Sequence, residues 1–171
     1  MFYRHLVLLC CLWMSAPLQA QDAPNNTQLS VWANEAIIAT FTYNYQDFLP
    51  QQKEIATYFT GDGWLRYSKA LLDAKLPDTI KTNAYYVSAV ATMPPEITKV
   101  DDHEWQAVMP VLVVYTNPAY KQKQSLAITV TFIEAPTGTG VRGFAITNLK
   151  AVVVKPPCEC AAKEEKFKAV G

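Results

Sequence analysis

The feature that most constrains the fold is a change in hydrophobic period close to Ala84. Before this point apolar residues recur every three to four positions, which is typical of helices that bury one face. After it apolar and polar residues alternate, as in LAITVTFIE over 126–134. Helices followed by strands predict an α+β domain, in which helices pack on one face of a curved antiparallel sheet of about four strands.

The first part of the chain predicts three helices. The first spans 29–45 and is apolar over most of its circumference, so other elements must surround it. Pro50 ends this helix, and a short second helix covers 51–59. The Thr or Asp of the turn 60–63 then caps a third helix. The polar stretch 77–83 closes the helical part.

The second part predicts strands joined by short turns, which favours an antiparallel meander. The expected strands cover 84–93, 104–116, 124–134 and 141–154, with 97–100 as a prolongation of the first. Pro110 lies inside the second of these strands. Because proline cannot donate a ladder hydrogen bond, we expect a bulge or an edge position there.

The first twenty residues predict a secretory signal peptide. Arg4 precedes an apolar run over 6–14, which is far shorter than the roughly 20 residues that a membrane span needs. Cleavage is expected between Ala20 and Gln21, after which the mature protein would be exported. The expected organisation is a signal over 1–20, a flexible leader over 21–28, one domain over 29–154 and a mobile tail over 155–171.

The composition excludes two broad classes of protein. The chain carries 15 basic and 15 acidic residues, and it therefore lacks the basic excess that nucleic-acid binding requires. Hydrophobic residues make up 50% of the chain and charged residues 18%, which is too apolar for intrinsic disorder. These values predict a globular domain that has no nucleic-acid partner.

The residues offer little for catalysis, and we expect no enzymatic activity, cofactor or metal. His103 is the one histidine outside the signal, and its acidic neighbours favour a solvated turn. The spacing of zinc ligands and the glycine-rich nucleotide fingerprints are both missing from the sequence. The alternative is a ligand-binding protein or enzyme with a pocket, in which Glu35 or Asp47 would act in an apolar surrounding. The aromatic residues between 43 and 67 would line that pocket, although core packing explains them better.

Cys158 and Cys160 form a C-x-C pair in the tail. In an exported protein oxidised cysteines are the usual state, so we expect a disulfide between the two or to a partner. Binding of a soft metal and unpaired thiols remain as alternatives.

Several motifs between about 29 and 149 occur in a fixed order. They include YNY at 43–45, AxYFTxxGW at 56–64 and WQAVMPxLVxY at 105–115. Together they resemble the IcmL/DotI family of type IVB (Dot/Icm) secretion systems. The resemblance implies an NTF2-like periplasmic domain and brings no catalytic residues. The chain departs from the family at its start, where a cleavable signal replaces the usual cytoplasmic segment and membrane span.

The resemblance implies a non-enzymatic component of a type IVB secretion system. With a signal in place of the span, we expect a structural or accessory subunit in the periplasm, associated with the outer-membrane-side core complex. Its partners would be other core subunits, with a homo-oligomer as a further arrangement.

Assembly requires surfaces that a single domain leaves unpaired, and edge strands provide them. The two candidate edges are the strand around 111–115 and the last strand, 144–154. Expected interface residues in the last strand are Phe144, Ile146, Leu149, Val152 and Val154. The alternative is that 152–154 packs on the helices.

Overall fold

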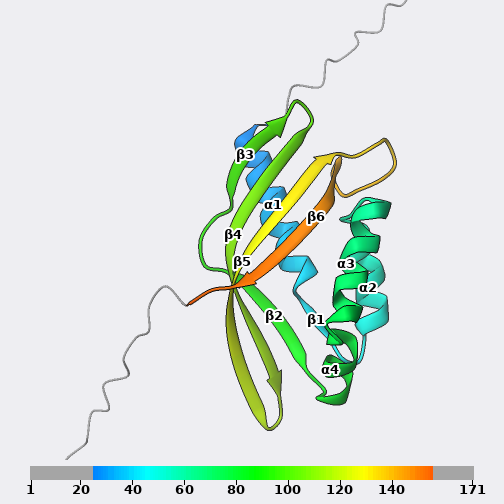
Figure 1. The fold of residues 1–171 in the computed structure, drawn as a ribbon, viewed down its shortest axis with the longest axis vertical. Helices are drawn as coiled ribbons and strands as arrows, with labels where there is room; N and C mark the ends of the chain where they lie inside the picture. The colour runs from blue at the N-terminus through cyan, green and yellow to red at the C-terminus, as the bar shows by residue number, and fades with distance from the viewer. Residues whose placement is uncertain (1–24, 156–171) are drawn as a thin grey trace, which may run out of the picture.

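The computed structural model describes residues 25–155, which form four helices and a six-stranded antiparallel sheet (Figure 1). The helical part contains α1 (Asn26–Thr40), β1 (Tyr43–Asn44), α2 (Phe48–Ala56), α3 (Gly61–Asp73) and α4 (Leu76–Thr82). The strands that follow are β2 (Tyr86–Ala91), β3 (Glu96–Asp101), β4 (Glu104–Asn117), β5 (Tyr120–Glu134) and β6 (Phe144–Val153). The α+β class is confirmed. The predicted cleavage site at Ala20 and Gln21 and the pair Cys158 and Cys160 lie outside the described residues.

Helix α1 begins earlier and ends earlier than predicted. The Asn25 side chain accepts a hydrogen bond from the Gln28 N–H at 2.9 Å, and the Gln28 side chain accepts one from the Asn25 N–H at 3.2 Å. This capping box starts the helix within the expected leader 21–28. At the other end Tyr43 pairs with Val87, so the residues after Thr40 become the edge strand β1 instead of a further helical turn.

Helix α4 occupies the stretch that was expected only to close the helical part. Lys75 adopts a left-handed conformation with φ of 53°, and Pro77 lies in the first turn, where its missing N–H needs no partner. Ile80 is fully buried and holds the helix on the core.

One side of β4 pairs with two different strands in succession. Residues 111–116 pair with β2, and residues 104–108 pair with β3. Pro110 lies at the junction, where its carbonyl accepts the Thr92 N–H at 3.0 Å. Because the N and C=O of one residue point to the same side of a strand, the proline nitrogen faces the junction and leaves the β5 ladder intact. Pro110 therefore does not bulge β4 or place it at an edge. It marks the point where the neighbour of β4 changes from β3 to β2.

Two predictions about the strands were wrong. Residues 111–115 are paired to β2 on one side and to β5 on the other, so they form no edge. Residues 97–100 belong to β3, a separate strand that pairs with β4 and does not prolong β2. The sheet order is β1-β2-β4-β5-β6, which leaves β6 at one edge.

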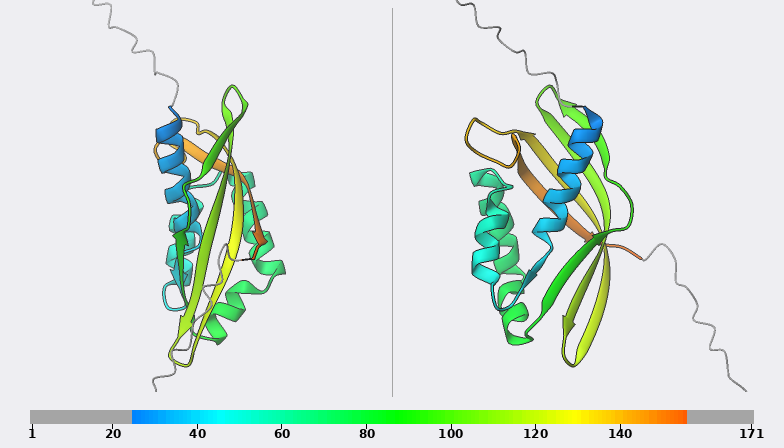
Figure 2. Two further views of the ribbon diagram at one scale, coloured as in Figure 1. Left: turned by 90° about the vertical axis from the view of Figure 1, so that its left-hand side faces the viewer. Right: turned by 180° about the vertical axis from the view of Figure 1, so that it is seen from behind.

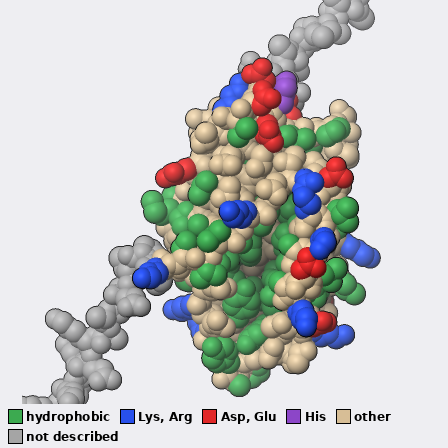
Figure 3. Space-filling view, viewed as in Figure 1, with side chains coloured by type: hydrophobic (Ala, Val, Ile, Leu, Met, Phe, Trp, Pro, Cys, Tyr) green, Lys and Arg blue, Asp and Glu red, His purple; other side chains and the backbone are tan. Residues whose placement is uncertain are grey.

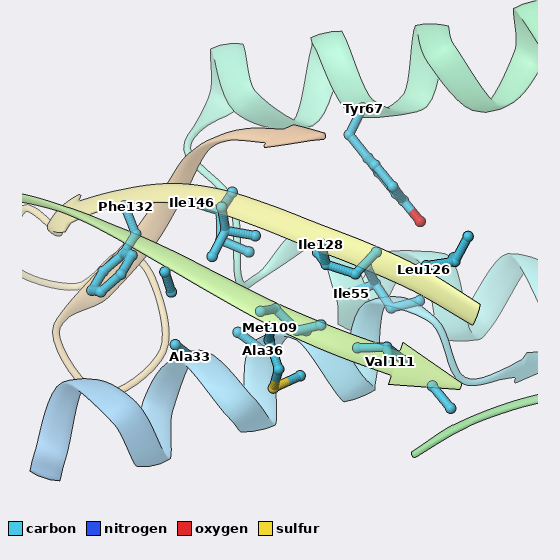
Figure 4. Close-up of a cluster of buried hydrophobic side chains, with 14 of the residues drawn as sticks. Ala33, Ala36, Ile55, Tyr67, Met109, Val111, Leu126, Ile128, Phe132 and Ile146 are labelled. Atoms are coloured by element: carbon cyan, nitrogen blue, oxygen red, sulfur yellow. The ribbon is translucent and has the colours of Figure 1, made fainter. Parts of the chain in front are cut away.

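The core lies between α1 and the concave face of the sheet (Figures 2 and 4). Ala33 and Ala36 are completely buried, and their small side chains let α1 approach Met109 of β4 closely (Figure 4). The aromatic residues of the helical part belong to this core. Tyr43, Phe59 and Tyr67 are buried, and the partly buried rings packed against the core include Tyr45, Phe48, Tyr58 and Trp64.

Candidate assembly surface at the edge of β6

The N-terminal half of β6 is covered by the chain itself. The Thr60 N–H donates to the Ile146 carbonyl at 2.9 Å, and the Ile146 N–H donates to the Tyr58 carbonyl at 2.8 Å. Residues 58–60 thus act as a short parallel strand at this edge. The Arg66 guanidinium donates to the Thr147 carbonyl at 2.6 Å and closes the next position.

The C-terminal half of β6 has a bare edge. The Val154 N–H donates to the Ser125 carbonyl at 2.9 Å, so Val154 points its backbone groups toward β5. Because these groups alternate along an antiparallel strand, those of Leu149, Ala151 and Val153 point away from β5. Among residues 25–155 none of these N–H and C=O groups has a hydrogen-bond partner. This run of three residues, 149, 151 and 153, is called the free edge below.

The side chains of the free edge lie on the concave face of the sheet. Leu149, Ala151 and Val153 stand opposite Val130, Ile128 and Leu126, which are all buried. The side chain of Val153 is nevertheless 64% exposed, and Val152 on the convex face is 46% exposed. The end of β6 therefore presents apolar side chains to solvent on both faces.

The predicted interface residues separate into two groups. Phe144 packs 5.5 Å from the Trp32 ring, and Ile146 is fully buried, so both belong to the core. Leu149 is half-buried, whereas Val152 and Val154 are exposed. The expected alternative, in which 152–154 packs on the helices, is not what the structure shows.

A hollow lies beside the free edge. Figure 3 shows it as an apolar depression on the face seen in Figure 1, between the end of β6 and α3. Tyr67 points from α3 toward the sheet near Leu126 (Figure 4), and its hydroxyl donates to the Thr40 carbonyl at 3.3 Å. Burial raises the pKa of Tyr67 and of Tyr43, and the nearby Tyr115 hydroxyl adds to both shifts. Both phenols are therefore neutral at physiological pH.

Positive charges lie on and next to β6. Arg66 of α3 bonds the Thr147 carbonyl, β6 carries Lys150 on its convex face, and Lys155 follows the strand. Lys69 of α3 forms an ion pair with Asp73 at 2.6 Å, which compensates both charges. We did not predict from the sequence that α3 packs beside β6 or that Arg66 bonds its backbone. The pattern of a helix does not indicate which strand it will contact.

The carboxyl groups of the alternative catalytic interpretation are engaged elsewhere. Glu35 forms an ion pair with Arg142, and it accepts a hydrogen bond from the Tyr58 hydroxyl at 2.9 Å. Asp47 is exposed at the start of α2, beside the Asn44 amide. Neither carboxyl group therefore lies unpaired in an apolar cavity.

A groove and an exposed histidine lie elsewhere within residues 25–155. A shallow groove of about 450 Å³ between α1 and the β2–β3 loop is lined by uncharged residues, among them Val31, Asn34 and Met93. His103 is exposed in the β3–β4 turn, 3.1 Å from Glu134. Within the described range no three His, Cys, Asp or Glu side chains gather as metal ligands would.

Solved structures with little sequence similarity share this fold. VirB8 of Agrobacterium tumefaciens matches with a TM-score of 0.53 at 10% identity, over 78% of this chain and 98% of that chain. An NTF2-like protein from Salmonella enterica matches with a TM-score of 0.52 at 10% identity, over 81% and 94%. The predicted NTF2-like fold is therefore confirmed, in the form that VirB8 proteins also adopt.

Two comparisons go further and show the family. An IcmL-like type IV secretion system protein from Legionella pneumophila is 54% identical over 81% of this chain and 99% of that chain, with a TM-score of 0.79. The periplasmic domain of DotI is 28% identical over 75% and 96%, with a TM-score of 0.71. The family model for DotI/IcmL, described as a type IVb secretion system inner-membrane complex component, matches residues 14–153.

The chain therefore belongs to the DotI/IcmL family and is a component of a type IVB secretion system. Members of this family are subunits of a larger assembly, so the protein contacts other subunits. No curated protein sequence matches the chain. From Asn25 to Lys155, none of the helices has the length and apolar character that crossing a membrane requires.

Proposed function

We propose that this protein is a non-enzymatic structural subunit in the periplasm, which acts by assembling with other subunits of the type IVB core complex on the outer-membrane side. The observation that supports the proposal most strongly is the family match over residues 14–153. The described part of the chain also has an unpaired sheet edge, which a partner could occupy. The signal-like segment 1–20 and the likeness to the periplasmic domain of DotI support the location.

The proposal is tested by purifying the tagged full-length protein from envelope membranes in a gentle detergent and identifying what copurifies. We expect secretion-system core subunits in stoichiometric amounts. Osmotic-shock fractionation of cells that lack the other subunits tests the location. We expect the protein in the periplasmic fraction of these cells. Recovery of a monomer without partners would contradict the assembly role and would direct attention to small ligands instead.

The cysteine pair has a separate role in this proposal. In the oxidising periplasm Cys158 and Cys160 form a disulfide, either with each other or with a partner. Intact mass spectrometry of the alkylated protein distinguishes the cases. An internal disulfide protects both thiols without adding mass, a disulfide to a partner gives a reducible adduct, and free thiols take up two alkyl groups and contradict the proposal.

A further inference from the structure

We propose that the free edge of β6 receives an extended strand from another protein, and that this strand places apolar side chains in the hollow and acidic side chains toward solvent. The inference rests on the proposed function and deepens it, because it specifies the surface and the chemistry of the partner. Three observations support the inference: the unpaired backbone groups of β6, the apolar side chains of the same residues, and the charged residues near this edge.

The backbone of the free edge matches the hydrogen-bonding pattern of a strand. Leu149, Ala151 and Val153 each present an N–H and a C=O at the two-residue spacing of a β ladder. The upper part of the same edge already pairs with residues 58–60, so its geometry accepts a strand. After Thr60 the chain enters α3, which reaches the edge as far as Thr147 through Arg66. An added strand would take the position in line with 58–60.

The apolar side chains predict which residues that strand carries. Leu149, Ala151 and Val153 face the hollow, and Val153 is largely exposed although its cross-strand partner Leu126 is buried. Alternate side chains of an added strand would point into the hollow and cover these groups. We expect them to be apolar, because the neighbouring side chains of β5 on this face, Leu126, Ile128 and Val130, are apolar and buried.

The charges favour an acidic partner over a second copy of this chain. Residues 144–155 contain Lys150 and Lys155 but no Asp or Glu. Pairing two copies of β6 would gather four lysines around one ladder, with no carboxylate from either strand. A strand with outward-facing Asp or Glu would instead place a carboxylate beside Lys150, whose side chain lies on that face.

Photo-crosslinking in cells that contain the secretion system tests the inference. The photoreactive residue benzoylphenylalanine is placed at position 153, beside the hollow, and at position 152 as a matched control on the opposite face. We expect position 153 to crosslink to another protein, at a peptide that alternates apolar residues with Asp or Glu. Position 152 should give markedly less of this adduct.

The identified peptide is then synthesised, and its binding to the purified full-length protein is measured by fluorescence anisotropy. We expect Val153→Asp to weaken binding at least about tenfold, because it places a carboxylate in the apolar hollow. Ala151→Pro removes an outward N–H without touching the β5 ladder, and we expect a similar loss. Val152→Asn is the control, because it adds a polar but uncharged side chain on the opposite face, and it should bind as the parent does. Circular dichroism verifies that each variant is folded.

Each other outcome overturns the inference. A crosslink from position 153 to a second copy shows a homotypic edge, and a crosslink to residues 156–171 of the same chain shows that its own tail covers the hollow. Stronger crosslinking or a greater effect at position 152 assigns binding to the convex face. If core subunits copurify but no crosslink forms at 153, the inference fails while the proposed function stands. If nothing copurifies, the proposed function is contradicted, and the inference that rests on it is contradicted as well.

Discussion

At the residue scale, Gly63 sets how closely α3 approaches β6. A Cβ atom at this position would lie 2.3 Å from the Ile146 carbonyl oxygen, whereas at Gly61 it would meet nothing within 4 Å. We therefore expect Gly63→Ala to lower the free energy of unfolding by about 1–3 kcal/mol, despite the better helix propensity of alanine. Gly61→Ala is the matched control and should be neutral or slightly stabilising. Urea denaturation of both variants measures this, and equal effects would show that α3 can shift freely.

Gln52 is a second residue whose environment predicts a measurable effect. Its side-chain amide is buried, and neither its nitrogen nor its oxygen has a partner within the described structure. Replacing it with methionine keeps the shape and removes the unpaired polar atoms, so Gln52→Met should stabilise the protein by about 1–2 kcal/mol.

The neighbouring glutamine provides the control for this substitution. The Gln51 side chain accepts the Asn44 N–H at 2.8 Å. Gln51→Met removes that acceptor and should destabilise by about 1 kcal/mol. Thermal denaturation compares the two variants. If Gln52→Met were as destabilising as Gln51→Met, the Gln52 amide would have to be hydrogen-bonded in solution.

At the scale of elements, β6 should show alternating protection in hydrogen exchange. The amides of Leu149, Ala151 and Val153 point away from β5, whereas those of Lys150 and Val152 point toward it. We expect fast exchange for the first three amides of the isolated protein and slow exchange for the other two. NMR-detected exchange resolves each amide. Uniform protection along 149–153 would mean that the edge is already covered.

The strands could be predicted from the sequence, but their neighbours could not. The alternation in 126–134 directly indicates β5, and Pro110 indicates an interruption in β4. Whether β4 meets one partner or two depends on long-range pairing, which no local pattern encodes. Helix α4 was missed because Ile80 is its one fully buried residue, and the start of α1 was predicted three residues too late because the Asn25 and Gln28 capping pattern was not used.

At the scale of the whole molecule, buried tyrosines make stability depend on alkaline pH. The pKa values of Tyr43 and Tyr67 are raised in the folded state, mainly by burial. In the unfolded chain these phenols ionise near pH 10, so above this pH the unfolded state binds fewer protons than the folded state. The free energy of unfolding should be unaffected below about pH 9 and should then fall by about 1.4 kcal/mol per pH unit for each tyrosine.

The variants Tyr43→Phe and Tyr67→Phe test this dependence separately. Each should reduce the slope of stability against pH between about pH 10 and 12 by about 1.4 kcal/mol per unit. Urea denaturation at several pH values measures the slope, and the same variants at pH 7 control for lost packing and hydrogen bonding. An unchanged slope in both variants would show that these hydroxyls ionise as readily in the folded protein.

The long reach of the contacts that fix the helices has a consequence for the order of folding. The Trp32 indole bonds the Val141 carbonyl 109 positions away, and Thr60 meets Ile146 86 positions away. The β3–β4 and β4–β5 hairpins, by contrast, close over short turns. Because closing a long loop costs more chain entropy than closing a short one, the hairpins should form first. The helices emerge earliest from the ribosome but gain their partners last, and α3 in particular can dock only after β6, the last strand, is in place.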